Sequence, residues 1–294
     1  MNRLICRAAA LLISLCLLSA APARAEEDIS VFDLWDDDLI EEVSYGDVEW
    51  DFPVDLSDMD PDLIRLANRT CLLPHDYEPD DLVSVKARKA NKDGSNANGG
   101  MLKASGSSMK LRRVCAEALV AMSEAARAEG IYLYLKSAYR SCGTQTTMYN
   151  NRLVKMGRDD GWVIRPQASD HQTGLGCDVV SKAWCDTSMN EKFARTKEAQ
   201  WMAAHCAEYG FILRYPEDKT EITGINFEPW HLRYVGIPAA SYIMENGLCL
   251  EEFHDQLQAA IDEFIAAGGS ASLVRPYEQV SAEDKYVPPK LKKK

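Results

Sequence analysis

The sequence predicts an α+β fold in which a small antiparallel sheet is flanked by helices. Apolar residues recur at helical spacing in four segments, and three of these segments end at a glycine, a common helix stop. Short extended segments lie between and after these helices. Because the later extended segments follow one another through short connections, antiparallel pairing is favoured over the helical crossovers that a parallel sheet requires.

The first predicted helix ends at Gly130 and shows its helical spacing in Leu111, Val114, Ala118, Met122 and Ala125. A strand pattern follows directly, because Ile131, Leu133 and Leu135 alternate with two tyrosines. The 20 residues before this helix, Lys89 to Ser108, are rich in Gly, Asn and Ser and predict a long surface loop, a type of segment that often borders an active site.

The second helix is expected over Thr144–Met156 and ends at Gly157. The segment GCDVVS then predicts a buried strand. A third helix is expected over Asn190–Tyr209, and two short extended pieces, FILRYP and EPWHLRYVG, come after it. The last helix is expected over Ala239–Leu257, with a break at Gly247.

The N-terminus has the features of a secretory signal. Two arginines precede an apolar run from Ala8 to Ala21, which is shorter than the roughly 20 residues that cross a bilayer, and Ala23-Arg24-Ala25 resembles a cleavage site. Residues 1–25 are therefore predicted to be a signal peptide. We expect the mature protein to be exported, and to be extracellular, associated with the cell wall or periplasmic.

The acidic charge is confined to one segment. The chain has a formal net charge of −12, yet residues 26–62 contain 16 Asp and Glu and no Lys or Arg. This composition predicts an acidic linker or arm outside the core, followed by a main domain over residues 63–268. Residues 269–294 form a basic C-terminal tail, for which contact with anionic envelope polymers is one interpretation and a solvated, disordered tail is the other. Nucleic acid is not an expected partner.

Nine cysteines occur, and seven of them lie beyond the signal segment. Export permits disulfides, but an odd number leaves at least one thiol unpaired within the chain. No Cys-x-x-Cys pair is present, which argues against a zinc site built from thiolates. The spacing does not reveal which cysteines pair.

Of the five histidines, three have neighbours that predict a structural role. His75 lies between prolines without a partner pattern, His205 is expected to pack on the third helix, and His254 is expected on a solvated helix face. The other two have carboxylates nearby. His171 precedes Asp178 by seven residues, and His231 follows Glu228 by three.

These four residues include the components of a zinc hydrolase site. Such a site needs three protein ligands, an open position for water, and a nearby carboxylate that accepts a proton. His171, Asp178 and His231 would supply the ligands and Glu228 the base. From spacing alone the alternative stays open, in which Asp178 caps a turn and His231 packs under Trp230. The metal site is favoured because Asp178 lies in an otherwise apolar strand, where an unpaired carboxylate is costly.

Several motifs in order carry a family resemblance: SAYRS at 137–141, SDHQTGLGCDV at 169–179 and EPWHLRYVG at 228–236. Together with flanking segments from about residue 66 to 254, they resemble the VanY-like D-alanyl-D-alanine carboxypeptidase family of zinc peptidases, including relatives that trim L-lysyl-D-alanine. The resemblance implies that one zinc ion per chain is held by His171, Asp178 and His231 at the sheet cleft, and that Glu228 is the catalytic base.

The resemblance also implies that Arg140 faces the substrate. A guanidinium there suits stabilisation of an oxyanion or a two-pronged clamp on a terminal carboxylate. Gln145 and Ser169 match positions where the family has polar residues that line the cleft, while Trp230 and Tyr234 are interpreted as packing residues. The chain departs from the family pattern at Pro166-Gln167, where a Pro-Gly pair is common, at Asp170, where Glu is common, and at Gly176-Cys177. Cys177 is compatible with a spectator, a disulfide partner or a redox-sensitive thiol.

The implied function is an exported zinc carboxypeptidase that removes the terminal D-alanine from peptidoglycan stem peptides, at a D-Ala-D-Ala or L-Lys-D-Ala type of bond. Two alternatives are a peptidoglycan endopeptidase with the same zinc chemistry and a non-catalytic module that binds the cell wall. All three ligands and the base are present, which disfavours the non-catalytic module. The sequence does not choose between D,D- and L,D-specificity.

Overall fold

The computed structural model describes residues 48–85, 87–88, 101–104 and 108–289. Its main sheet has six strands in the order β2-β3-β5-β6-β8-β7, and a separate antiparallel pair joins β1 (Leu82–Ser84) to β4 (Lys110–Arg112). The strands of the main sheet are β2 (Ala87–Arg88), β3 (Met101–Lys103), β5 (Tyr134–Ser137), β6 (Gly176–Val180), β7 (Phe211–Leu213) and β8 (His231–Tyr234).

The α+β class is confirmed, with one difference in the sheet. The pairs β5–β6, β6–β8 and β7–β8 are antiparallel as expected, whereas β2–β3 and β3–β5 are parallel. Residues 101–103, which the composition placed in a surface loop, form the strand β3, with Met101 and Leu102 buried in the core. The predicted loop residues 89–100 and 105–107 lie outside the described residues.

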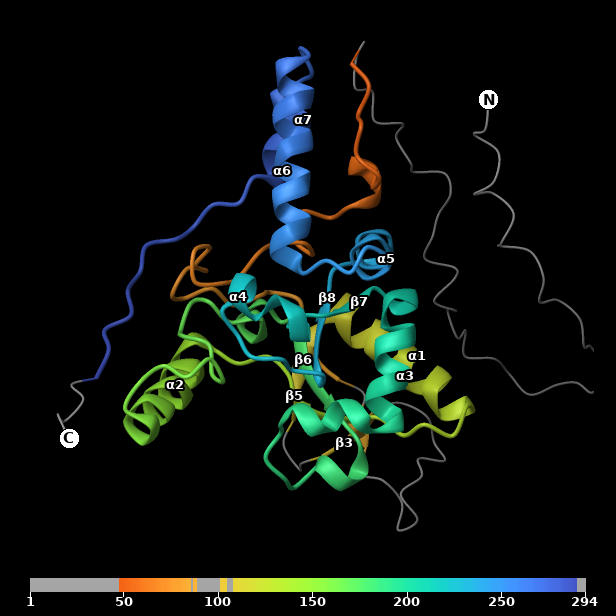
Figure 1. The fold of residues 1–294 in the computed structure, drawn as a ribbon, viewed down its shortest axis with the longest axis vertical. Helices are drawn as coiled ribbons and strands as arrows, with labels where there is room; N and C mark the ends of the chain where they lie inside the picture. The colour runs from red at the N-terminus through yellow and green to blue at the C-terminus, as the bar shows by residue number, and fades with distance from the viewer. Residues whose placement is uncertain (1–47, 86, 89–100, 105–107, 290–294) are drawn as a thin grey trace, which may run out of the picture. The chain divides into compact units, whose positions relative to one another are not determined.

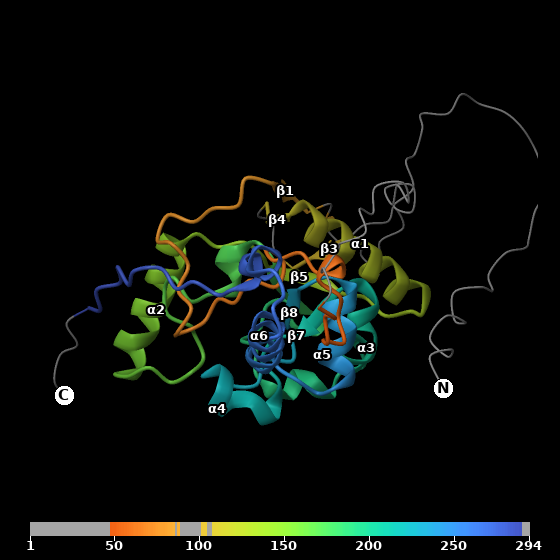
Figure 2. The same ribbon diagram turned by 90° about the horizontal axis from the view of Figure 1, so that it is seen from above.

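Helices cover the sheet on both sides, with α1 and α3 together on one side and α2 on the other (Figures 1 and 2). The described helices are α1 (Arg113–Ala128), α2 (Cys142–Met156), α3 (Lys197–His205), α4 (Thr220–Thr223), α5 (Ile237–Glu245), α6 (Leu250–Ala266) and α7 (Ala271–Val274). Within the described residues, no helix has both the length and the apolar character to cross a membrane.

Local sequence explains where these helices begin and end. In α2 the Ser141 hydroxyl accepts a hydrogen bond from the Thr144 N–H, and Gly157 ends the helix in the left-handed conformation. The third predicted helix is interrupted because the Thr196 hydroxyl accepts from the Ala199 N–H and starts a new helix, α3, after a 3₁₀ segment at 191–195. The last predicted helix is broken at Gly247, as expected, into α5 and α6.

Residues from Trp50 onward pack against α6 in a hydrophobic cluster of their own. Trp50 is buried and its ring lies 5.7 Å from that of Phe264, and Val54, Leu56 and Met59 are buried in the same cluster. The composition had placed these residues in an arm outside the core. The apolar side chains scattered among the acids form a buried face of their own, so burial outweighs the acidic composition of this segment.

The region after α7 also differs from expectation. Tyr277 is buried, and its hydroxyl donates to the backbone carbonyls of Leu56 and Met59. Residues 281–286 make further hydrogen bonds along the domain, so this part of the tail is ordered rather than a solvated extension. Residues 290–294, with four of the five terminal lysines, lie outside the described residues.

His254 is buried, although its acidic neighbours predicted a solvated face. Its Nε2 donates to the carbonyl oxygen of Ile64 at 2.6 Å, because α6 packs against residues 50–66. Burial lowers the pKa of the ring to about 4. His205 does stack on Trp201, with ring centroids 4.7 Å apart, but it stays partly exposed and pairs with Glu208.

Burial of neutral His254 predicts a pH-dependent stability. The unfolded ring binds a proton below about pH 6.5 and the folded ring only below about 4, so stability falls as the pH drops between these values. From pH 7 to pH 5, His254 should account for about 2 kcal/mol of lost unfolding free energy. Urea unfolding of the wild type and of His254→Gln at both pH values measures this difference. An equal loss in the two proteins would contradict the prediction.

Candidate active site

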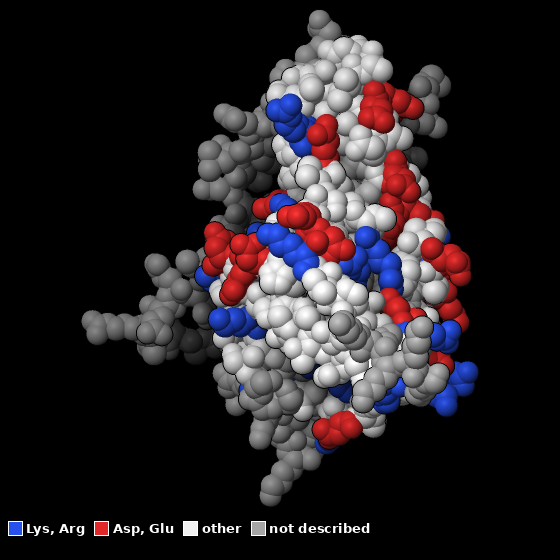
Figure 3. Space-filling model, turned by 90° about the vertical axis from the view of Figure 1, so that its left-hand side faces the viewer, with Lys and Arg blue, Asp and Glu red and all other residues white. Residues whose placement is uncertain are grey.

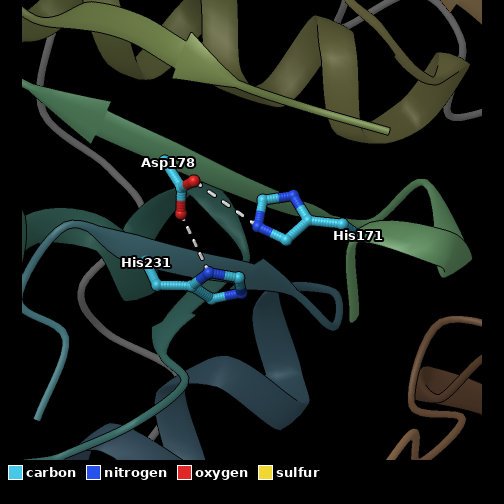
Figure 4. A group of neighbouring side chains, drawn as sticks. All are labelled: His171, Asp178 and His231. Atoms are coloured by element: carbon cyan, nitrogen blue, oxygen red, sulfur yellow. Dashed lines mark hydrogen bonds and ion pairs between the residues drawn. The ribbon is translucent and has the colours of Figure 1, made fainter. Parts of the chain in front are cut away.

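Two neighbouring strands and the turn before one of them bring His171, Asp178 and His231 together (Figure 4). Asp178 on β6 lies directly opposite His231 on β8 in the antiparallel register, and His171 lies in the 3₁₀ turn Asp170–Thr173 just before β6. The Asp178 Oδ1 is 3.0 Å from His231 Nδ1, and its Oδ2 is 3.5 Å from His171 Nε2. One potential ligand atom from each residue lies within 4.8 Å of the others.

Hydrogen bonding and burial prepare His171 and Asp178 for metal binding. His171 Nδ1 donates to the Ala138 carbonyl at 2.8 Å, which leaves the lone pair on Nε2, the atom that faces Asp178. Burial, assisted by the charge of Arg140, lowers the pKa of His171 to about 4. Burial alone would raise the pKa of Asp178, but His171, His231 and Arg140 hold it well below its usual value.

This donor set fits a zinc ion. Two neutral imidazoles and one carboxylate are common zinc ligands, and three protein ligands leave a fourth position for water. All three residues are buried, and His231 Nε2 has no hydrogen-bond partner among the described residues. The cluster is thus a convergent set of buried nitrogen and oxygen donors, which is the arrangement expected of a metal site.

The glycines between the ligands are required by the tight turn. Gly174 ends the 3₁₀ turn with φ of +70°, a left-handed conformation that side chains other than glycine disfavour. A Cβ at Gly176 would lie 2.9 Å from the Cβ of Asp170 and 3.0 Å from its carbonyl carbon. The chain therefore reverses closely enough for His171 and Asp178 to reach one ion.

Glu228 lies at the edge of the metal cluster. It is 8% exposed and lines the pocket, and its Oε2 is 3.7 Å from His231 Nδ1. Burial raises the pKa of Glu228 well above its ordinary value, and the nearby Asp178 carboxylate raises it further, against an opposing effect of Arg140. A carboxyl group with a raised pKa beside a metal site is suited to accept and return a proton.

Arg140 contacts the candidate metal ligand Asp178 directly, which the sequence did not predict. Its guanidinium donates to Asp178 Oδ2 at 2.9 Å, to Ser137 Oγ at 3.0 Å and to Gln145 Oε1 at 3.3 Å. A guanidinium has five N–H donors, so two remain for a substrate after these three bonds. Arg140 lines the pocket with a side chain that is 16% exposed.

The remaining two predicted site residues also lie at the pocket, in different situations. Gln145 is buried and both ends of its amide are engaged, since Nε2 donates to the Ile164 carbonyl at 2.7 Å and Oε1 accepts from Arg140. Ser169 is buried, and its hydroxyl has no hydrogen-bond partner among the described residues. Gln145 therefore braces the pocket, while Ser169 retains a free hydroxyl there.

The pocket that contains these groups has a volume of about 150 Å³. Its wall includes residues that sequence reasoning missed: Met148, Trp162, Met189 and Tyr215. Trp162 stacks on Trp230 at 6.3 Å between centroids, and the Tyr215 ring lies 5.0 Å from that of His231. Trp230 and Tyr234 are buried, as expected of packing residues, and Trp230 also lines the pocket.

A buried charge network supports the turn that carries His171. Asp170 is fully buried and accepts hydrogen bonds from Arg214 Nε at 2.6 Å and from Arg233. Arg214 also donates to both carboxylate oxygens of Glu251 on α6, at 2.7 Å each. A signal for this network was present, because Arg214 directly follows the apolar strand β7 and Arg233 lies within β8, between Leu232 and Tyr234.

All seven described cysteines are free. Cys177 has no exposed surface and lies in the same core cluster as Cys115, and burial raises the pKa of its thiol well above the ordinary value. Of the three interpretations left open for Cys177, its position in this structure fits the spectator.

Comparison with known proteins relates this site to characterised relatives. Residues 108–237 match the family model described as VanY, D-alanyl-D-alanine carboxypeptidase. The putative carboxypeptidase YodJ of Bacillus subtilis (strain 168) is 35% identical over 198 residues, which cover 67% of this chain and 68% of that protein. A D-alanyl-D-alanine carboxypeptidase of Enterococcus faecalis (strain ATCC 700802 / V583) is 38% identical over 141 residues, 44% of this chain and half of that protein.

The fold is similar to that of solved relatives. A structure of the LdcB LD-carboxypeptidase, studied for its recognition of peptidoglycan, is 36% identical and matches with a TM-score of 0.56 over 67% of this chain and 87% of that one. The ligand motifs at 169–179 and 228–236 lie within the residues that match the family model. YodJ is 35% identical to this chain, and the match covers 68% of YodJ. The chain therefore belongs to the VanY family of D-alanyl-D-alanine carboxypeptidases.

Proposed function

We propose that this protein is a zinc-dependent carboxypeptidase that removes the terminal D-alanine from peptidoglycan stem peptides. One observation carries the proposal: buried Glu228 shares a pocket with the cluster of His171, Asp178 and His231. The family membership supports the reaction class. The named activities of the relatives, D-alanyl-D-alanine carboxypeptidase and LD-carboxypeptidase, support a substrate that ends in D-alanine.

The residues divide the chemistry of hydrolysis among themselves. Zinc held by His171, Asp178 and His231 would supply the Lewis acidity that activates water and polarises a carbonyl. Glu228 accepts the proton of the attacking water and returns it to the amine of the departing D-alanine. Its raised pKa suits both halves of this transfer, since a strongly acidic carboxyl would hold the proton too weakly to return it.

Arg140 has two tasks in this proposal. Its bond to Asp178 orients a metal ligand, and its remaining donors face the pocket, where they bind either the oxyanion at the scissile carbonyl or the terminal carboxylate. The free hydroxyl of Ser169 is a further donor for the peptide.

The test uses purified protein and defined substrates. A pentapeptide ending in D-Ala-D-Ala, a tetrapeptide ending in L-Lys-D-Ala or its equivalent, and a cross-linked dimer are incubated with and without chelator, and products are identified by mass. Release of free D-alanine alone supports the proposal, and the preferred peptide defines the bond. Cleavage of the cross-link without release of D-alanine would instead indicate an endopeptidase.

Removal of the metal is expected to abolish activity without unfolding the domain. The chelated protein should lose peptide hydrolysis and regain it with added Zn²⁺, because the ligands are positioned by the sheet and its hydrogen bonds rather than by the ion. Circular dichroism of the chelated protein checks that the fold is retained. Activity that persists after complete removal of zinc would contradict the assignment.

Export of the mature protein is part of the proposal, because stem peptides belong to the cell envelope. The signal features of residues 1–25 support export. N-terminal sequencing of the protein recovered from the cell envelope or medium should show a chain that starts at Glu26. The lysines of the C-terminus are proposed to contact anionic envelope polymers, which binding at low and high salt would test.

A further inference from the structure

The chain after the last helical turn, Arg275–Tyr277, crosses back over the domain and reaches α2 (Figures 1 and 2). We call residues 281–286 the C-terminal strap; they lie outside the residues that match the family model. Its first contacts are with Leu72, whose N–H donates to Ser281 Oγ at 3.0 Å and whose carbonyl accepts from the Ala282 N–H at 2.8 Å.

Gln167 joins the strap to the loop that leads into the metal site. Its amide nitrogen donates to the carbonyls of Glu283 and Leu73, and its amide oxygen accepts from the Lys285 N–H at 2.8 Å. Gln167 has φ of +66° and is the one residue other than glycine with a positive φ among the described residues. This conformation is unfavourable for glutamine, so the contacts on its two sides must hold it there.

A second group of contacts ties the strap to this loop and to α2. Asp284 accepts from the Arg165 guanidinium at 2.5 Å, and the same guanidinium lies 5.5 Å from the centre of the Tyr286 ring. The Tyr286 hydroxyl donates to Asn150 Oδ1 at 2.7 Å, and its ring packs edge-on against Tyr149 at 5.6 Å. Asn150 and Tyr149 both belong to α2.

From these anchors the contacts lead directly to the site. Ile164, next to Arg165, lines the pocket and accepts the hydrogen bond of Gln145 on α2. Gln145 in turn accepts from Arg140, which binds the metal ligand Asp178. The strap thus contacts both elements that form this wall of the pocket, namely α2 and the loop 158–168.

We propose that the C-terminal strap is a positioning element that holds the loop 158–168 against α2 and so sets the shape of the wall that receives the substrate peptide. This inference rests on the proposed function for its substrate. It predicts that weakening the strap impairs peptide binding more than chemistry, because Glu228 and the three ligands lie on other elements.

The test is a charge reversal at the Arg165–Asp284 pair in the full-length, zinc-loaded protein. Arg165→Glu and Asp284→Arg are each expected to raise KM for the pentapeptide about fivefold, with kcat nearly unchanged, and the double variant should restore KM. Glu283→Arg, the same charge change on the exposed neighbouring residue of the strap, is the control and should leave KM unchanged. Zinc content is measured for every variant.

Amide hydrogen exchange of residues 158–168 supplies a readout independent of substrate. Exchange should accelerate in each single reversal and return to the wild-type rate in the double variant. If the single reversals change neither KM nor exchange, or if the double variant fails to recover, the strap does not position the loop. If the wild type releases no D-alanine, the proposed function fails, while exchange still decides the role of the strap.

Discussion

Replacement of Glu228 by glutamine is expected to reduce kcat for D-alanine release by about a thousandfold while zinc stays bound. Glutamine preserves the size of the side chain but cannot accept the proton of the attacking water or deliver one to the leaving amine. Glu228 is not one of the three clustered candidate ligands, and its Oε2 lies 3.7 Å from His231 Nδ1. The metal should therefore remain, and the loss should fall on chemistry.

The measurement is steady-state hydrolysis of the pentapeptide, together with the zinc content of the variant. Glu221→Gln, at an exposed position on α4, makes the same chemical change away from the pocket and should retain full activity. KM of Glu228→Gln should change much less than kcat, because the base acts in the transition state. Full activity of a zinc-loaded Glu228→Gln protein would remove Glu228 from the mechanism.

Much of the candidate site could be predicted from the sequence because an ionisable residue there lies in an otherwise apolar strand. Asp178 is a carboxylate in an apolar strand, and such a group must have a partner once it is buried. The structure provides three, His171, His231 and Arg140. The first two were expected as fellow ligands. The Arg140 bond was not expected, because it joins residues 38 apart in the chain and no local pattern indicates it.

Other features were not predictable because they depend on contacts between distant segments. The strand β3 has three residues within a composition typical of loops, and its parallel pairing with β5 arises from tertiary packing. The strap resembles a solvated tail in composition, and half of its hydrogen bonds to the rest of the domain use backbone groups, at Ala282, Glu283 and Lys285, which composition does not reveal. Figure 3 shows acidic and basic side chains interspersed on the face that it presents, and no charge patch of a single sign dominates this view.

The buried network around Asp170 could be predicted from the sequence only in part. Arg214 and Arg233 stand out as charges next to or within short extended segments, yet their shared partner is 44 and 63 residues away in the chain. Asp170 directly precedes the ligand His171, and Arg233 is two residues after the ligand His231. One buried carboxylate thus links the two segments that carry the imidazoles, and Glu251 extends the link to α6.

Asp170→Asn is therefore expected to be strongly destabilising, although it preserves the volume of the side chain. The variant leaves Arg214 with Glu251 alone and removes the carboxylate that pairs with buried Arg233, and the loss of a buried ionic partner costs about 3–5 kcal/mol of unfolding free energy. Burial opposes ionisation of Asp170, yet Arg214 and Arg233 hold its pKa below the ordinary value, so the charged form is the one that the fold requires.

Urea unfolding of zinc-free protein measures the stability term, and competition with a chromophoric chelator measures zinc affinity. We expect zinc to bind at least tenfold more weakly in Asp170→Asn, because the turn that orients His171 loses its anchor. Asp255→Asn, at an exposed position on α6, removes an equal charge and should alter neither quantity. If Asp170→Asn lost no more stability than Asp255→Asn, the two arginines would be satisfied without Asp170, and the link between the imidazole segments would have to reside in the sheet register alone.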